Sequence, residues 1–451
     1  MATRIILVRH GESTFNTQRR VQGHCDDSTL TETGRNAARQ VGAAICDLPV
    51  QMVYSSPLRR ARTTADLILE SFSPAPSIET SPLLLEVNLP NWEKMTFEEV
   101  EASFPDDYRL WKACPHELRM DIPSPEGDIE HYPVRALYDQ AKRFWQSILP
   151  RHGSGTIVVV GHSGVNRALL QTAMGLGPQS YSRFYISNCG ISILNIADDL
   201  STADGPSGDV QLESLNVVSH LGESYPPVRS GHVGPRLLLV RHGETDWNRD
   251  KRFQGQIDIP LNDNGRRQAA QCADFLKTAQ IDRAVSSSMS RPKETAEIIL
   301  QSHVGVPLST MDALQEIGHG LWEGQLEPDI HKAYPGLLQQ WKDAPETVQM
   351  PEGENLQQVW DRAIAAWAEI VASVRPGEVI LVTAHDAVNK ALLCHLSGLG
   401  PEHFWTFKQG NGAVSVIDYP SGPKGPPLLQ SINITTFLGS GVLDKTAAGA
   451  L

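Results

Sequence analysis

Residues 4–15 read RIILVRHGESTF, and residues 236–247 read RLLLVRHGETDW. Each stretch begins with an apolar run that is typical of a buried strand, and Arg-His-Gly follows this run directly. Further matched segments follow in the same order: VQGHCDDSTLTETGR (21–35) with FQGQIDIPLNDNGR (253–266), VYSSPLRRARTTADLIL (53–69) with VSSSMSRPKETAEIIL (285–300), LLLEVNLPNWE (83–93) with ALQEIGHGLWE (313–323), IVVVGHSGVNRALL (157–170) with ILVTAHDAVNKALL (380–393), and SNCGISIL (187–194) with GNGAVSVI (410–417). A repeat of this length indicates two similar domains in tandem.

The repeat sets the domain boundaries. It predicts one domain over residues 1–222 and a second over residues 236–440. Residues 223–235 between them are rich in Gly and Pro, which is typical of a linker. The last residues, 441–451, are expected to form a loose tail.

Each half alternates short apolar runs with longer segments of helical spacing. In the first half, strands are expected at Ile5–Val8, Met52–Tyr54 and Ile157–Val160, and helices at Asn36–Ile45, Ala61–Leu69 and Val134–Ile148. Alternation of strand and helix predicts an α/β fold with a mostly parallel sheet. We therefore expect two tandem three-layer α/β/α sandwich domains.

Composition narrows the class of partner. The chain has 451 residues, a net charge of −13 and 20% charged residues, which argues against a nucleic-acid or anionic-membrane partner. No apolar run approaches the roughly 18 residues of a membrane span. The 6 cysteines suggest neither a zinc site nor a disulfide framework. Because the first expected strand starts close to Met1, no leader is predicted, and we expect a cytoplasmic protein or a mature form whose leader was removed.

Polar side chains follow the expected strands at the points where they end. His10 follows Ile5–Val8, His162 follows Ile157–Val160, and Arg60 comes just after the serines that end a third strand. The carboxyl ends of parallel strands meet at one edge of a sheet, where ligands bind. We therefore expect these side chains to share a site. The second half offers the same set: His242, His385 and Arg291.

These residue types suit phosphoryl transfer. A phosphate monoester carries nearly two negative charges, and the arginines Arg9 and Arg60 can contact its oxygens in bidentate fashion. His162 can donate a further hydrogen bond, as can the amide of Asn16 and the backbone of a helix expected after Gly11. The corresponding phosphate-binding residues of the second half are Arg241, Asn248 and Arg291.

His10 and His242 are the candidate nucleophiles. A neutral imidazole can attack phosphorus and form a phosphohistidine, and nearby positive charge favours the neutral form. The leaving oxygen needs a proton, for which Glu86 and Glu316 are the candidate donors if their pKa values are raised. No metal or other cofactor is expected.

Other polar residues have plainer interpretations. Arg59 and Arg62 flank Arg60 and are expected on a solvated helix face. The tryptophans are expected in the cores. The loop histidines His131 and His319 are considered only as possible substrate contacts.

The segments LVRHGES, SSPLRRARTTA, LLLE and VVGHSGVN resemble the signatures of the histidine phosphatase superfamily, in its phosphoglycerate mutase branch. The resemblance covers nearly the whole chain, twice. It implies that the histidine of each RHG is phosphorylated, that the arginines and the later histidine bind phosphate, and that the glutamate donates the proton. The carried-over residues are Arg9, His10, Arg60, Glu86 and His162, then Arg241, His242, Arg291, Glu316 and His385.

Mutases of this family resemble one another in an ERHYGxLxGxNK segment, which is absent here. The segments EVNLPNWEKM and EIGHGLWEG favour a phosphatase, although LPNWEKM lacks the usual glycines. HYPVR (131–135) and SNCG (187–190) resemble the two-domain 2-carboxy-D-arabinitol-1-phosphate phosphatases. The resemblance implies sugar or sugar-acid phosphates as substrates. Two alternatives stay open: a mutase-type phosphotransferase, or one catalytic domain beside a metabolite-sensing domain.

Overall fold

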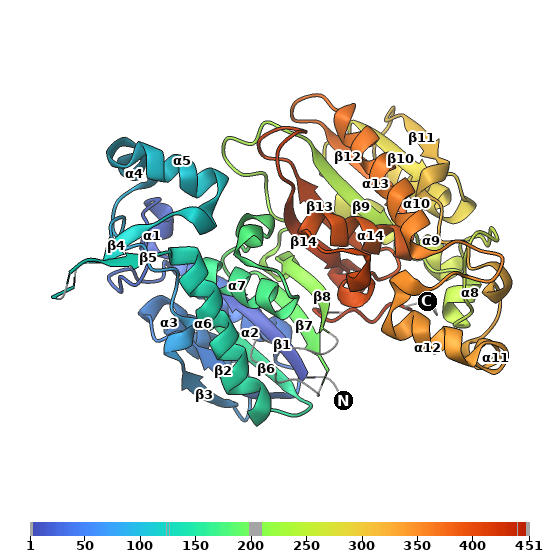
Figure 1. Cartoon of the computed structure of the whole chain (residues 1–451). Helices are drawn as coiled ribbons and strands as arrows, with labels where there is room; N and C mark the ends of the chain where they lie inside the picture. Colours follow the sequence, from blue (N-terminus) through green and yellow to red (C-terminus); the bar gives the residue numbers. More distant parts are fainter. Residues whose placement is uncertain (1–2, 123, 126, 198–209, 440, 448–451) are drawn as a thin grey trace. The chain divides into compact units, whose positions relative to one another are not determined.

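The computed structural model of the chain describes residues 3–122, 124–125, 127–197, 210–439 and 441–447. The chain divides into two compact units, Met1–Glu223 and Ser224–Leu451, and each is treated by itself (Figure 1). In the described part of the chain, no helix is both long and apolar enough to cross a bilayer. The described residues also contain no group of three or more His, Cys, Asp or Glu side chains placed to hold a metal ion.

A mostly parallel sheet forms the centre of the first unit. Its strand order is β8-β7-β1-β6-β2-β3, in which β1, β6, β2 and β3 run parallel, β7 pairs antiparallel with β1, and β8 pairs antiparallel with β7. The bounds are β1 (Thr3–Arg9), β2 (Val50–Ser55), β3 (Ser77–Thr80), β6 (Thr156–Gly161), β7 (Ile191–Ile196) and β8 (Val210–Val217). The prediction of a mostly parallel sheet is therefore confirmed for this unit.

Helices cover both faces of this sheet. α2 and α3 pack against each other on one face, and α6 and α7 on the other (Figure 1). The bounds are α1 (Thr14–Thr17), α2 (Glu32–Ile45), α3 (Arg59–Leu69), α6 (Pro133–Ile148) and α7 (Ser163–Ala173). A smaller region holds α4 (Phe97–Ser103), α5 (Pro105–Ala113) and the hairpin of β4 (Met120–Ile122) with β5 (Ile129–His131). The three-layer α/β/α prediction is confirmed.

The second unit repeats this architecture. Its strand order is β11-β10-β12-β9-β13-β14, with β13 antiparallel to both of its neighbours. The strands are β9 (Arg236–Arg241), β10 (Arg283–Ser287), β11 (Leu308–Met311), β12 (Val379–Ala384), β13 (Val414–Asp418) and β14 (Leu428–Ile434). The helices are α8 (Asp246–Arg249), α9 (Asp263–Leu276), α10 (Ser290–Leu300), α11 (Glu327–Ala333), α12 (Pro335–Asp343), α13 (Leu356–Ala372) and α14 (Asp386–Ser397).

Burial explains why these segments take these forms. The run Ile5–Val8 is at most 1% exposed, because β1 lies between β6 and β7 and is covered on both faces. α2 begins where the side chain of Thr31 accepts a hydrogen bond from the Gly34 N–H. Its buried residues recur on one side, so the helix places one apolar stripe on the sheet. The parallel strands of this sheet end at one edge, and the predicted polar site residues follow them there.

The segments outside the two repeats pack on the second unit. Tyr225, within residues 223–235, contacts the ring of Phe275, and Val233 N–H donates to the Pro420 carbonyl at 3.1 Å. At the other end, Asp444 is almost fully buried and accepts from Thr446 N–H at 2.9 Å. The expectation of a loose tail is therefore wrong for residues 441–447, because Asp444 supplies buried hydrogen bonds to this unit. Residues 448–451 of that tail lie outside the described residues.

Candidate active site

His10 lies directly after β1, at the edge of the sheet where β6 also ends. Its Nδ1 is 2.7 Å from the carbonyl oxygen of Gly11. A carbonyl oxygen can only accept, so the proton of the neutral ring is on Nδ1 and Nε2 carries the lone pair. Burial, followed by the charges of Arg60 and Arg9, lowers the pKa of His10 well below its ordinary value. The imidazole is therefore neutral at pH 7, the form that can attack phosphorus.

His162 supplies a second neutral ring. Its ring centroid lies 5.1 Å from that of His10, and its Nε2 is 2.8 Å from Ser56 Oγ. Ser56 Oγ already accepts the Leu58 N–H, so its own proton is free to reach Nε2. In the tautomer in which Ser56 donates to Nε2, the ring proton of His162 is on Nδ1, which is buried and has no hydrogen-bond partner among the described residues. Nδ1–H is thus a donor that a phosphate oxygen could use.

Two arginines flank these rings. Arg60, in the first turn of α3, donates to the carbonyls of Cys25 at 2.8 Å and Gly23 at 3.0 Å. Arg9, at the end of β1, donates to the Ile186 carbonyl at 2.8 Å. These contacts fix both guanidinium groups, while the Nε of each is buried without a partner in the described part of the chain. Fixed, unsatisfied cationic donors are what a phosphate dianion requires.

The backbone after His10 is arranged differently from the sequence-based expectation. Gly11 N–H donates to Thr64 Oγ1 at 3.0 Å, and the helix that follows is only α1, already capped by Ser13. The prediction that N–H groups of this helix bind phosphate is therefore wrong. A Cβ on Gly11 would lie 2.4 Å from the Gly34 carbonyl oxygen, so glycine is needed for close backbone packing against α2.

The amide of Asn16 is held by its oxygen. Its Oδ1 accepts from Ser13 N–H at 3.1 Å and from Asn188 Nδ2 at 3.3 Å. Asn188 Nδ2 also donates to the His10 carbonyl at 2.9 Å. The NH₂ group of Asn16 therefore remains as the donor. Sequence reasoning missed Asn188, although the shared asparagine in SNCG and GNGA was a signal for it.

Glu86 occupies the N-terminus of α7. Its carboxylate accepts from the N–H groups of Gly164 and Val165, both at 3.1 Å, where the helix dipole favours negative charge. His24 Nε2 lies 2.8 Å from the Glu86 carbonyl oxygen and helps to hold the segment. The Glu86 charge raises the pKa of Arg60 against the larger, lowering effect of burial. The carboxylate therefore lies within electrostatic reach of Arg60.

The second unit brings its predicted residues together in the same way. His242 Nδ1 is 2.7 Å from the Gly243 carbonyl oxygen, and His385 Nε2 is 2.9 Å from Ser287 Oγ. The two rings have centroids 5.2 Å apart. Arg291 Nε donates to His242 Nε2 at 3.2 Å, which marks that nitrogen as the one with the lone pair.

The second site is more enclosed than the first. Glu316 and Arg241 are each 3% exposed, whereas Glu86 and Arg9 are half-buried. Glu316 accepts from the N–H groups of Asp386 at 3.0 Å and Ala387 at 3.1 Å. Burial, followed by the charge of Asp386, raises the pKa of Glu316. This is the direction that a proton donor needs near neutral pH.

Comparison with known families agrees with this geometry. The sequence profile of the histidine phosphatase superfamily (branch 1) matches residues 5–205 and 237–431. The chain belongs to the histidine phosphatase superfamily. It is a phosphoric monoester hydrolase, and the family mechanism runs through a phosphohistidine.

Named histidine phosphatases resemble this one over one or both units. The 2-carboxy-D-arabinitol-1-phosphatase of Triticum aestivum is 28% identical over 451 residues, covering 97% of this chain and 87% of that protein. Phosphoserine phosphatase 1 of Hydrogenobacter thermophilus is 31% identical over 204 residues, 45% of this chain and 94% of that protein. The mycobacterial glucosyl-3-phosphoglycerate phosphatase solved with VO3 has a TM-score of 0.37 and 29% identity, covering 41% of this chain and 92% of that one.

In the two units of this histidine phosphatase, Glu86 and Glu316 accept hydrogen bonds from different positions of the matching helices. Gly164 in α7 takes the place of Ala387 in α14. A Cβ on Gly164 would lie 2.4 Å from Glu86 Oε1 and 2.7 Å from the Tyr181 hydroxyl oxygen. Because Ala387 has that methyl group, Glu316 binds N–H groups one position earlier along its helix.

This difference gives a first prediction. Gly164→Ala should displace Glu86 and lower phosphate release by the first unit about tenfold, a modest share of the 10²–10⁴ that an acid–base group contributes. The rate is measured in a His242→Ala chain, in which only the first unit keeps its RHG histidine. Ala387→Gly in a His10→Ala chain is the matched control, because it removes a methyl group and adds no clash. Equal rates with and without the Gly164→Ala substitution would contradict the predicted displacement of Glu86.

The loops that follow Glu86 and Glu316 adopt similar conformations despite their different sequences. Glu93 accepts from Cys25 N–H at 3.2 Å, and Glu323 accepts from Ile257 N–H at 2.8 Å. Lys94 has φ +68°, close to the +78° of Gly324 at the matching position. The first loop therefore keeps the turn without glycine, at the cost of a left-handed lysine.

The two loop histidines have separate outcomes. His319 is fully buried, with ring centroids 5.3 Å from Phe253 and 6.0 Å from Trp341, and burial lowers its pKa to about 3. The prediction of a possible substrate contact is wrong for His319, because aromatic rings enclose it. His131 ends β5, with Nε2 3.1 Å from the Asn88 carbonyl, and its contact with substrate stays a prediction.

Proposed function

We propose that each unit hydrolyses small phosphomonoesters through its own phosphohistidine, formed on His10 and on His242. The observation that carries the proposal is the Nδ1 contact of each ring with the following glycine carbonyl. It leaves the lone pair of Nε2 available at the edge of the sheet, beside buried arginine donors. Retention of this arrangement in both units favours two catalytic sites over one catalytic and one sensing domain.

In the first step, the substrate phosphate is held by the arginines, the second histidine and the asparagine amide. Nε2 of His10 attacks phosphorus as the bond from phosphorus to the leaving oxygen breaks. The leaving oxygen takes a proton from Glu86, and the phosphoryl group is then on His10. The positive charges around the site stabilise the charge that develops on the phosphoryl oxygens.

In the second step, a water molecule replaces the departed alcohol. The Glu86 carboxylate accepts a proton from this water as its oxygen bonds to phosphorus and the N–P bond breaks. Inorganic phosphate leaves, and the site returns to a neutral His10 and a protonated Glu86. His242 and Glu316 take the same roles in the second unit.

The substrates proposed are phosphorylated sugars and sugar acids. The Triticum aestivum relative, which covers 97% of this chain, supports 2-carboxy-D-arabinitol 1-phosphate as one candidate. Small size is favoured by the limited exposure of both sites, since His10 and His242 are each 2% exposed. A panel of sugar phosphates, phosphoglycerates, phosphoserine and 2-carboxyarabinitol 1-phosphate would define the substrate.

The second prediction separates hydrolysis from a mutase reaction. With substrate carrying labelled phosphorus, rapid quenching should trap an acid-labile, alkali-stable label on each unit of the wild-type chain. The label should end as free inorganic phosphate. Recovery of an isomerised substrate without free phosphate would instead support a phosphotransferase of the mutase type.

A further inference from the structure

A cation on the helix after the second histidine differs between the two units. It is Arg167 in α7 and Lys390 in α14, at matching positions of the repeat. Each lies over an aromatic ring: the Arg167 guanidinium carbon is 5.3 Å from the centroid of Tyr181, and Lys390 Nζ is 5.1 Å from that of Phe404. Both units therefore place a cation at this helix position. The groups around Arg167 and Lys390 decide whether each cation is free to bind an anion.

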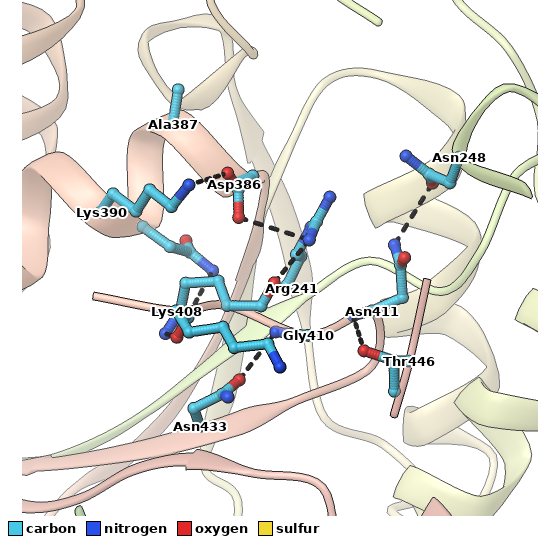
Figure 2. Close-up of polar contacts among 12 residues, drawn as sticks. Arg241, Asn248, Asp386, Ala387, Lys390, Lys408, Gly410, Asn411, Asn433 and Thr446 are labelled. Atoms are coloured by element: carbon cyan, nitrogen blue, oxygen red, sulfur yellow. Dashed lines mark hydrogen bonds and ion pairs between the residues drawn. The ribbon is translucent and has the colours of Figure 1, made fainter. Parts of the chain in front are cut away.

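In the second unit this charge is neutralised internally. Lys390 Nζ lies 2.7 Å from Asp386 Oδ2, and Asp386 Oδ1 lies 3.3 Å from Arg241 Nη1. Figure 2 shows Asp386 between the two cations. Nearby, Lys408 Nζ lies 3.6 Å from Asp444 Oδ2. In the same region, the amide nitrogen of Asn248 points away from Asn411 (Figure 2). Both lysines beside this site are thus paired with carboxylates.

The first unit lacks the pairing carboxylate. Ser163 stands where the second unit has Asp386. Within the described residues, Arg167 forms no ion pair, and its Nε is buried without a hydrogen-bond partner. Arg167 as a whole is half-buried, so its partly desolvated guanidinium remains open to an anion.

Arg167 also borders the reacting groups. The hydroxyl of Tyr181, over which it lies, and Oε1 of Glu86 both stand within 3 Å of the place where a Cβ on Gly164 would be. Burial lowers the pKa of Arg9 most, and the positive charge of Arg167 lowers it further, so the two cations act on each other. Arg167 therefore lies beside both the phosphate-binding arginine and the proton donor.

We propose that Arg167 binds a second acidic group of the substrate, so that the first unit selects phosphomonoesters that also carry a carboxylate. A guanidinium offers a planar pair of donors that fits a carboxylate. In the second unit such a group would meet the negative charge of Asp386 and a lysine already paired, so that unit takes uncharged alcohol phosphates. This assignment rests on the proposed function and gives the two units different substrate classes.

The test compares 3-phosphoglycerate with glycerol 3-phosphate, which differ in the carboxylate. In the His242→Ala chain, Arg167→Ala should lower the preference for 3-phosphoglycerate, as the ratio of kcat/KM values, about tenfold or more, mainly through KM. Arg167→Lys should lose part of the preference. Arg62→Ala is the control, because Arg62 pairs with Asp66 on the exposed face of α3. In the His10→Ala chain, Asp386→Ser should raise the preference for 3-phosphoglycerate.

The outcomes separate the two proposals. Unchanged preference in both Arg167→Ala and Arg167→Lys, with hydrolysis retained, would overturn the role of Arg167 alone. Loss of both substrates in equal proportion would show a general role and would also overturn it. If the parent chain hydrolysed neither compound, the proposed function would fail for these substrates. Calorimetric Kd values for both compounds in a Glu86→Gln, Glu316→Gln chain, measured with and without Arg167→Ala, would then still decide whether Arg167 recognises the carboxylate.

Discussion

Alanine in place of both His10 and His242 is expected to abolish phosphoenzyme formation and to lower phosphate release by on the order of 10⁴-fold or more. In each ring the Nδ1 contact with the following glycine carbonyl leaves the lone pair on Nε2, the nitrogen that can attack phosphorus. The second histidine cannot substitute, because its Nε2 faces a serine hydroxyl. Each single variant should lose the label of its own unit and keep that of the other.

A half-buried histidine away from the sites provides the control for this experiment. His152 lies near the start of β6, at the opposite end of that strand from His162, and its Nε2 is 2.8 Å from the Tyr54 hydroxyl. His152→Gln should keep both labels. Label that persists in the double alanine chain would place the nucleophile elsewhere and would contradict the proposed mechanism.

The sequence predicted the residues that strand ends bring together. Apolar runs such as Ile5–Val8 and Ile157–Val160 are legible because central parallel strands are buried on both faces. Once these strands lie side by side, His10 and His162 must meet at their carboxyl ends. That step needs only the order of strand and helix, which the repeat shows twice.

The partners that orient these residues were harder to predict. Ser55 and Ser56 are adjacent, and only the alternation of side chains along β2 decides which of them reaches His162. Glu86 and α7 are far apart in the chain, so nothing local indicates that the carboxylate occupies the N-terminus of this helix. Such contacts depend on the three-dimensional path of loops.

The glycine of RHG shows the same limit of prediction from sequence. The backbone that follows the RHG glycine was expected to bind phosphate, but the close contact of this glycine is with Gly34 of the neighbouring helix. Both causes call for a residue without Cβ, so composition cannot distinguish them. The tail gave a similar error, since its small and polar residues hide one buried aspartate, Asp444, that fixes Lys408.

Glu316→Gln, in the His10→Ala chain, is expected to lower phosphate release from alkyl phosphates by about 10²–10⁴-fold. Glutamine keeps the shape of the side chain but cannot give a proton to the leaving oxygen. An aryl phosphate, whose leaving group is stable without a proton, should lose much less. Glu369→Gln on the exposed side of α13 is the control, and it should leave both rates unchanged.

The pH dependence of the same site supplies an independent check. Burial and Asp386 raise the pKa of Glu316, so the protonated donor persists to a higher pH than an ordinary carboxyl group allows. The rate should fall as pH rises through that pKa, and this alkaline limb should disappear in Glu316→Gln. On the acid side, the pKa of His242 lies well below its ordinary value, because burial and Arg291 oppose protonation. Activity should therefore persist below about pH 6.5, where a free imidazole would be protonated. A rate that stays flat through the alkaline range in the parent chain, or an alkaline limb that survives in Glu316→Gln, would remove Glu316 as the proton donor.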